Sequence, residues 1–113
     1  MVSYIPDQMD IIMIDLDPQK GTEIAKRRPC LVLSKRIINK SSHRILVCPI
    51  TSTPPFSQLH LTLPDQMITK GTLLLDQIRT LDYTKRNPKK IETLKDVEFY
   101  DTIVQYILIF IKR

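Results

Sequence analysis

The sequence predicts a mainly β protein of the α+β class: a small, strongly bent, barrel-like sheet followed by one C-terminal helix. Three observations predict it: short apolar stretches with strand character, turn residues between them, and a late stretch with helical spacing. The chain has 113 residues, of which 42% are hydrophobic, so it can bury a core of its own. We therefore expect one domain covering residues 1–113.

The first half of the chain predicts strands at residues 11–14, 31–34 and 44–50. Pro18 should end the first strand, because proline cannot donate a ladder hydrogen bond. Residues 19–28 lack periodicity and are expected to form an exposed loop. The turn-forming residues 39–42 should join the second and third strands into an antiparallel hairpin.

The second half predicts more strands and then a helix. Residues 59–63 alternate between leucine and polar residues, which places His60 on the polar face of a half-buried strand. Gly71 precedes another apolar run, and residues 76–82 alternate again. Thr93 and Asp96 resemble the start of a capped helix that extends to Ile111. This helix is apolar on most sides, which suggests a subunit contact.

Charge and cysteine use limit the kind of protein. The net charge of +5 and the pI near 9.4 favour a polyanionic partner. Cys30 and Cys48 lie in apolar runs and read as buried hydrophobic residues, without a zinc pattern. The N-terminus does not resemble a signal peptide, and the longest apolar run is too short to cross a bilayer. A cytoplasmic location is therefore expected.

Positive charge is concentrated between residues 20 and 44, where Glu23 is the only acid. The basic residues of this stretch are Lys20, Lys26, Arg27, Arg28, Lys35, Arg36, Lys40 and Arg44. A solvated loop and strand edge would explain them, and so would a phosphate-binding surface. The sequence pattern alone leaves both interpretations open.

Arg28 is the strongest candidate for chemistry. It precedes Pro29 and opens an apolar strand, so it should be held extended at the mouth of a sheet. A guanidinium matches phosphate oxygens. Antiparallel pairing would bring Thr51 to the same end, and Glu23 could reach it. These groups suffice to cleave RNA, whose 2′-hydroxyl is an internal nucleophile, with Glu23 as the base. No metal or cofactor is needed.

Two other constellations are weaker. His43 and His60 could form an acid–base pair, but the predicted hairpin separates them. Asp10, Asp15 and Asp17 could bind magnesium, although acids at a strand boundary more often form turns. With only two glycines, the chain has no glycine-rich nucleotide loop.

At these positions the chain resembles the MazF/PemK toxins of bacterial type II toxin–antitoxin modules. The segments that carry the resemblance are DIIMIDLDP (10–18), GTEIAKRRPCLVLS (21–34), VCPITS (47–52) and LDQIRTLD (75–82). Their order and spacing cover nearly the whole chain.

The resemblance implies an SH3-like barrel that forms a homodimer and cleaves single-stranded RNA, leaving a cyclic phosphate and a 5′-hydroxyl. It also implies a small, MazE-like antitoxin with an acidic tail that covers the RNA site. By position, Arg28 and Thr51 match the family's catalytic arginine and threonine, and Glu23 matches a supporting acid. Further RNA contacts are expected from Lys26, Arg27, Ser52, Asp76, Gln77 and Arg79.

The chain departs from the family pattern in three places. Met9 and Lys26 stand where glycine is usual, and residues 53–56 are shorter than the usual glycine-containing segment. Sequence preference should therefore not be transferred. Two alternatives stay open: a related barrel that binds DNA gyrase without catalysis, and an RNA-binding module that has lost cleavage.

Overall fold

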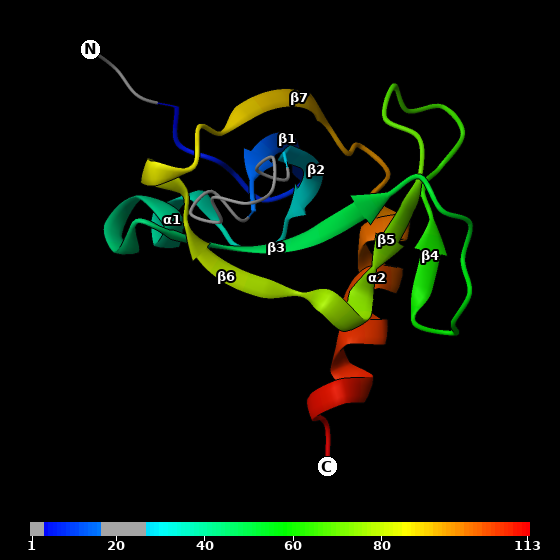
Figure 1. The fold of residues 1–113 in the computed structure, drawn as a ribbon. Coiled ribbons are helices and arrows are strands. Elements are labelled where there is room, and N and C mark those ends of the chain that lie inside the picture. Colours follow the sequence, from blue (N-terminus) through cyan, green and yellow to red (C-terminus); the bar gives the residue numbers. More distant parts are fainter. Residues whose placement is uncertain (1–3, 17–26) are drawn as a thin grey trace, which may run out of the picture.

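The computed structural model describes residues 4–16 and 27–113. Within these residues seven strands and two α-helices form the fold shown in Figure 1. The strands are β1 (Asp10–Asp15), β2 (Arg27–Val32), β3 (Arg44–Thr51), β4 (His60–Thr62), β5 (Thr72–Leu74), β6 (Arg79–Asp82) and β7 (Lys89–Thr93). The helices are α1 (Arg36–Ser42) and α2 (Val97–Ile111), and 3₁₀ turns cover Leu75–Gln77 and Tyr83–Lys85. The predicted α+β class with a late helix is confirmed.

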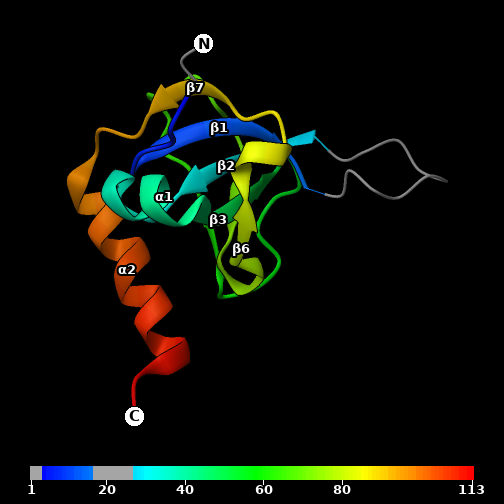
Figure 2. The ribbon, with the colours of Figure 1, turned by 90° about the vertical axis from the view of Figure 1, so that its left-hand side faces the viewer.

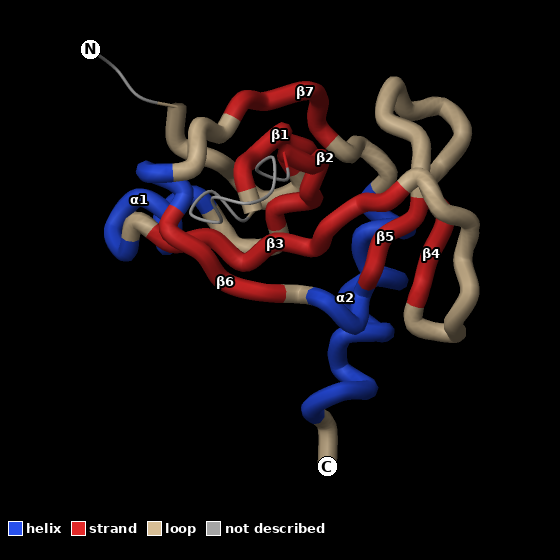
Figure 3. The backbone as a smooth tube through the Cα atoms, in the orientation of Figure 1, coloured by secondary structure: helices blue, strands red, loops and turns tan. Residues whose placement is uncertain are grey.

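The sheet is entirely antiparallel and turns around its longest strand, β3. Its order is β4-β5-β3-β2-β1-β7, and β6 also pairs with β3. The start of β3 pairs with β6 and its end pairs with β5. In Figure 3 the strands curve around one another, α1 lies beside the start of β3, and α2 lies near the 3₁₀ turn after β5. The change of neighbours along β3 bends the sheet into a partly closed barrel.

Two apolar cores lie on the two faces of this sheet, because successive side chains of a strand point to opposite faces. The first, which we call the helix-side core, includes two residues of α2 and consists of Ile11, Leu31, Leu33, Cys48, Ile50, Leu63, Met67, Leu73, Leu75, Leu94, Tyr100 and Ile103. The second, the strand-side core, consists of Ile12, Ile14, Leu16, Cys30, Val32, Ile45, Val47, Leu81 and Tyr83. Cys30 and Cys48 are buried and free, as expected, and lie in different cores.

The connection between β2 and β3 is a helix, not the predicted turn. Residues 39–42 belong to α1, which ends at His43 in a left-handed conformation. Asn39 is fully buried, and its side-chain amide donates to the carbonyl oxygens of Pro6 (2.9 Å) and Ser34 (3.0 Å). The turn prediction failed because the N-cap, Lys35, offers no side-chain hydrogen bond, so the usual start signal is missing.

The C-terminal helix is confirmed, but its start differs from the prediction. Thr93 is the last residue of β7, and the N-cap is Asp96, whose carboxylate accepts a hydrogen bond from the Phe99 N–H at 2.9 Å. The C-terminal part of α2 projects away from the strands in Figures 1 and 2. Accordingly, Ile109, Phe110 and Ile111 are exposed.

The second strand also differs, since it begins at Arg27, inside the region expected to be a loop. Pairing with β1 explains this, because Arg27 and Arg28 lie opposite Asp15 and Ile14. Pro18 lies outside the described residues.

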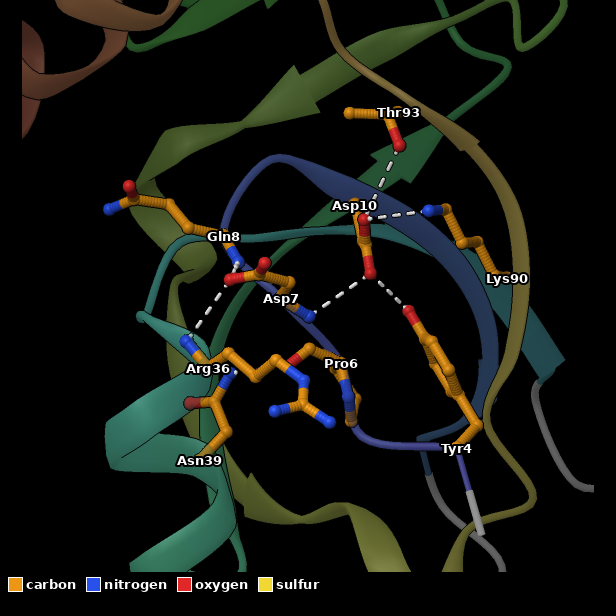
Figure 4. Close-up of polar contacts among 9 residues, drawn as sticks. All are labelled: Tyr4, Pro6, Asp7, Gln8, Asp10, Arg36, Asn39, Lys90 and Thr93. Atoms are coloured by element: carbon orange, nitrogen blue, oxygen red, sulfur yellow. Dashed lines mark hydrogen bonds and ion pairs between the residues drawn. The ribbon is translucent and has the colours of Figure 1, made fainter. Parts of the chain in front are cut away.

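Strand β7 was not anticipated from the sequence, and a buried carboxylate ties it to the N-terminal segment. Figure 4 shows Asp10 between the two segments. Its carboxylate accepts hydrogen bonds from the Tyr4 hydroxyl and from the Asp7 N–H (3.0 Å), and it pairs with Lys90 of β7 at 3.4 Å. Burial, followed by the contact with Asp10, raises the pKa of the Tyr4 hydroxyl, so this phenol stays protonated and donates.

Met9 adopts a backbone conformation that side chains disfavour, with φ at 75°. Its N–H donates to the Val32 carbonyl (2.9 Å) and its carbonyl accepts from the Leu94 N–H (2.8 Å), so neighbours on both sides fix it. The Met9 side chain also packs on the helix-side core. This is a position at which the resembled family usually has glycine.

Met9→Gly is therefore expected to be more stable than Met9→Ala, the reverse of the usual ranking. Both variants lose the packing of the side chain, but only glycine removes the cost of the positive φ, about 1 kcal/mol. Urea unfolding at one fixed protein concentration measures the difference. Equal or higher stability of Met9→Ala would contradict the strain at this position.

Candidate active site at the strand ends

A pocket of about 570 Å³ opens where several strands end. Its lining consists of Leu16, Arg28, Pro49, Thr51, Leu74, Gln77 and Arg79. These residues come from both sequence halves, and the antiparallel pairing of the strands brings them together. We call it the Arg28–Thr51 pocket.

Strand alternation explains why polar side chains meet here. Val47 lies in the strand-side core, so Thr51, four residues further along β3, is on the same face. By the same count Arg28 shares the face of Cys30, and Arg79 shares the face of Leu81. The apolar face therefore ends in two guanidinium groups and a hydroxyl.

The pairing of β2 with β3 sets the approach of Arg28 and Thr51. Cys30 lies opposite Pro49 in the antiparallel register. Continuing that register by two residues places Arg28 opposite Thr51, and both line the pocket. The hairpin geometry inferred from the sequence thus agrees with the structure, although a helix rather than a turn connects the strands.

The pocket carries positive charge beside a buried thiol. Burial raises the pKa of Cys30 to about 12, and the charges of Arg79 and Arg28 oppose that rise. Both guanidinium groups thus lie near the end of the strand-side core. The guanidinium of Arg28 makes no hydrogen bond or ion pair with any residue in 4–16 or 27–113. Two arginines near a hydroxyl form a suitable site for a phosphate.

Thr51 is half-buried, and its hydroxyl is already oriented. The Thr53 N–H donates to Thr51 Oγ1 at 3.3 Å, and the Thr51 hydroxyl donates to Thr53 Oγ1 at 3.4 Å. A ligand acceptor must therefore take the place of Thr53 Oγ1 to receive the single hydrogen of the Thr51 hydroxyl.

The remaining predicted site residues fall into three groups. Gln77 and Arg79 line the pocket, Asp76 adjoins Gln77, and Ser52 is exposed next to Thr51. Arg27 lies outside the lining. Glu23 and Lys26 lie outside the described residues.

Arg27 takes part in a cluster at the end of the β1–β2 pair. Its guanidinium donates to Asp15 Oδ1 (3.0 Å) and to the Asn87 carbonyl (2.8 Å). The Asn87 amide donates to Asp15 Oδ2 at 2.8 Å. Hydrogen bonds from Asn87 and Arg27 lower the pKa of Asp15. The contacts of Arg27 therefore stabilise the strand ends, and its expected contact with RNA stays a prediction.

The histidine pair does not form among the described residues. His60 is buried, not on a polar strand face, whereas His43 ends α1 and lies next to the start of β3. Asp10 is bound to Tyr4 and Lys90, and Asp17 lies outside the described residues. Across 4–16 and 27–113, no three of the His, Cys, Asp and Glu side chains form a metal-binding group.

Sequence reasoning did not find the apolar part of the lining. Leu16, Pro49 and Leu74 surround the polar groups, yet each reads as an ordinary strand residue. Their common signal is their place at strand ends, which requires the pairing to be known. In the described part of the chain, no helix has the length and hydropathy to cross a membrane.

The fold and the pocket define a small, barrel-like β protein with an arginine-lined pocket at its strand ends. Residues 7–109 match the family described as "PemK-like, MazF-like toxin of type II toxin-antitoxin system". The chain therefore belongs to this family of toxins.

Relatives with known names or structures support this placement. The chain is 34% identical over 99 residues to "Endoribonuclease toxin MazF" of Escherichia coli K12, covering 87% of this chain and 88% of that protein. It is 30% identical over 91 residues to the Escherichia coli "Endoribonuclease PemK", covering 77% of this chain and 68% of that protein. MazF of Deinococcus radiodurans superposes with a TM-score of 0.85 at 26% identity, covering 98% and 100% of the two chains. A MazE–MazF structure from the same organism superposes with a TM-score of 0.87 at 27% sequence identity, covering 96% of each chain.

Proposed function

We propose that this chain is an endoribonuclease, the toxin of a type II toxin–antitoxin module, and that it cleaves single-stranded RNA at short sequences without a metal ion. The observation that carries the proposal is one pocket that holds Arg28, Thr51 and Arg79 in a chain of this family. The MazF and PemK relatives from Escherichia coli are both named as endoribonucleases.

The proposed reaction uses the nucleophile of the substrate. The ribose 2′-oxygen attacks the adjacent phosphorus, and the bond from phosphorus to the 5′-oxygen breaks. The products are a 2′,3′-cyclic phosphate and a 5′-hydroxyl. One proton leaves the 2′-hydroxyl and one reaches the departing 5′-oxygen.

Each pocket residue has a place in this reaction. Arg28 stabilises the extra negative charge of the phosphorane and donates hydrogen bonds to its oxygens. Thr51 orients the phosphate through its hydroxyl. Arg79, on the same face of the sheet, adds a second positive charge. Glu23 stays a sequence-based proposal for the base.

Partners follow from charge and from exposed apolar surface. A polyanion or an acidic peptide suits a chain of net charge +5, so we propose that an acidic antitoxin tail covers the Arg28–Thr51 pocket. The exposed side chains of Ile109, Phe110 and Ile111 form an apolar surface at the C-terminal end of α2. We propose that a second copy of the chain covers it in a homodimer.

Incubation with a long defined RNA in EDTA, followed by mapping of the new 5′ ends, tests the function. We expect discrete cuts with 5′-hydroxyl ends, and no cut at a mapped site whose 2′-hydroxyl has been removed. A matched reaction with magnesium should give the same sites.

Other outcomes identify the alternative functions. RNA binding without cuts under both conditions would indicate a binding module. Inhibition of DNA gyrase without RNA cleavage would indicate the non-catalytic type of barrel toxin.

A further inference from the structure

A buried histidine lies behind one side of the Arg28–Thr51 pocket. The side chain of His60, on the short strand β4, is only 1% exposed. Its cross-strand partner on β5, Leu74, lines the pocket. A buried imidazole costs free energy unless its nitrogens find partners, so its contacts indicate its role.

Both ring nitrogens of His60 are engaged. The Phe56 N–H donates to Nδ1 at 3.4 Å, and Nε2 lies 3.2 Å from Asp76 Oδ1. Because Nδ1 accepts a hydrogen bond, the ring hydrogen is on Nε2, which donates to the carboxylate. The Phe56 ring meets the imidazole edge-on, with centroids 4.4 Å apart. His60 thus joins the segment after Thr51 to the turn that contains Asp76.

The pairing of β4 with β5 holds His60 close to Asp76. His60 lies opposite Leu74 in the antiparallel pair β4–β5, and Asp76 follows two residues later, within diagonal reach. Strands β4 and β5 run side by side in Figure 1. The Asp76 side chain is still 37% exposed, and the next residue, Gln77, lines the pocket.

We propose that His60 is a positioning residue for RNA: it binds Asp76 Oδ1, so that Asp76 presents Oδ2 beside the Arg28–Thr51 pocket. A carboxylate repels phosphate but accepts hydrogen bonds from the amino and imino groups of unpaired bases. The ligand of Asp76 is therefore a base that carries such a donor, next to the cleaved phosphate. The inference rests on the proposed function.

Two near-isosteric variants separate the two contacts of the imidazole. His60→Asn can accept from the Phe56 N–H but does not reach Asp76, whereas His60→Gln can donate to Asp76 but loses the Phe56 contact. We expect His60→Asn to raise the KM for RNA about tenfold, the scale of one hydrogen bond to a charged group, with kcat little changed. It should also lose the preference for sites with an amino-bearing base, and His60→Gln should restore both properties. Thr62→Ala, an exposed residue of the same strand, is the matched control.

A double-mutant cycle tests whether His60 acts through Asp76. Asp76→Ala should raise KM by a similar factor, and adding His60→Asn should raise it little further. The same cycle can be measured as Kd for RNA carrying 2′-fluorine, which cannot be cleaved. Nitrogen-15 NMR of the His60 ring should show the Nε2–H tautomer, with a shift of the Nε2 signal in Asp76→Ala.

Several outcomes would overturn the inference. Unchanged KM and site choice in His60→Asn would do so, as would additive effects of the two substitutions. A loss of kcat and stability without a KM change, equal in His60→Asn and His60→Gln, would indicate a purely structural role. If the parent binds the 2′-fluoro RNA but cuts no RNA, the proposed function fails, and the Kd cycle still decides the role of His60. If the parent neither binds nor cuts RNA, both fail.

Discussion

Arg28→Ala is expected to lower the rate of RNA cleavage by about 100- to 1,000-fold, the usual cost of removing a preorganised donor from a developing charge. Arg28 lines the pocket with Thr51 and forms no ion pair with another described residue. The substitution should therefore leave the fold intact. Single-turnover cleavage at saturating enzyme measures the chemical step, and circular dichroism checks the fold.

Two further variants separate charge from geometry. Arg28→Lys keeps the charge but loses the planar fork of donors, so it should recover only part of the rate. Lys85→Ala removes one positive charge from an exposed position outside the pocket lining and should cleave like the parent. A folded Arg28→Ala protein that cuts at the parental rate would remove Arg28 from the mechanism.

The sequence predicts the position of a site residue well where that position follows from the strand on which the residue lies. The apolar runs that become β2 and β3 were visible, and their pairing predicts that Arg28 and Thr51 come together. The charge of the Arg28 region was visible too. The strand pattern alone did not bring Arg79 to this pocket, because Arg79 enters through the pairing of β6 with β3; it was expected as an RNA contact only from the family resemblance.

The failed predictions share a physical cause. A polar residue reads as exposed unless its buried partners are known, and these partners lie far away in the chain. His60 has alternating neighbours typical of a half-buried strand, yet Asp76 and Phe56 satisfy its ring nitrogens inside the protein. Asn39 has a turn-like context, yet Pro6 and Ser34 accept its amide hydrogens. Strand β7 contains charged residues and was therefore not predicted as a strand. In the structure its Lys90 pairs with the buried carboxylate of Asp10.

Gly71→Ala is expected to damage both stability and the site, because the backbone of Gly71 touches the strand that carries Thr51. Gly71 has φ at +141°, a backbone conformation that only glycine adopts without strain. A Cβ atom here would lie 2.5 Å from the Thr51 carbonyl oxygen and 2.9 Å from Ile50 Cγ2. The pairing of β3 with β5 starts beside this contact, with Thr51 opposite Thr72. We expect the free energy of unfolding to fall by roughly 3 kcal/mol, from strain and overpacking together.

The close contact also links Gly71 to catalysis. The strand can accommodate a methyl group only if the end of β3 moves, and Thr51 then shifts relative to Arg28. Well below its midpoint of thermal unfolding, Gly71→Ala should therefore cleave RNA more slowly than the parent, while its KM changes less than its kcat. Lys70→Ala, at the exposed neighbouring residue, is the control and should match the parent in both measurements. A Gly71→Ala protein that is less stable but fully active would show that cleavage tolerates a displacement of Thr51. A Gly71→Ala protein as stable as the parent would show that the backbone of β3 can move to accommodate the methyl group without a loss of stability.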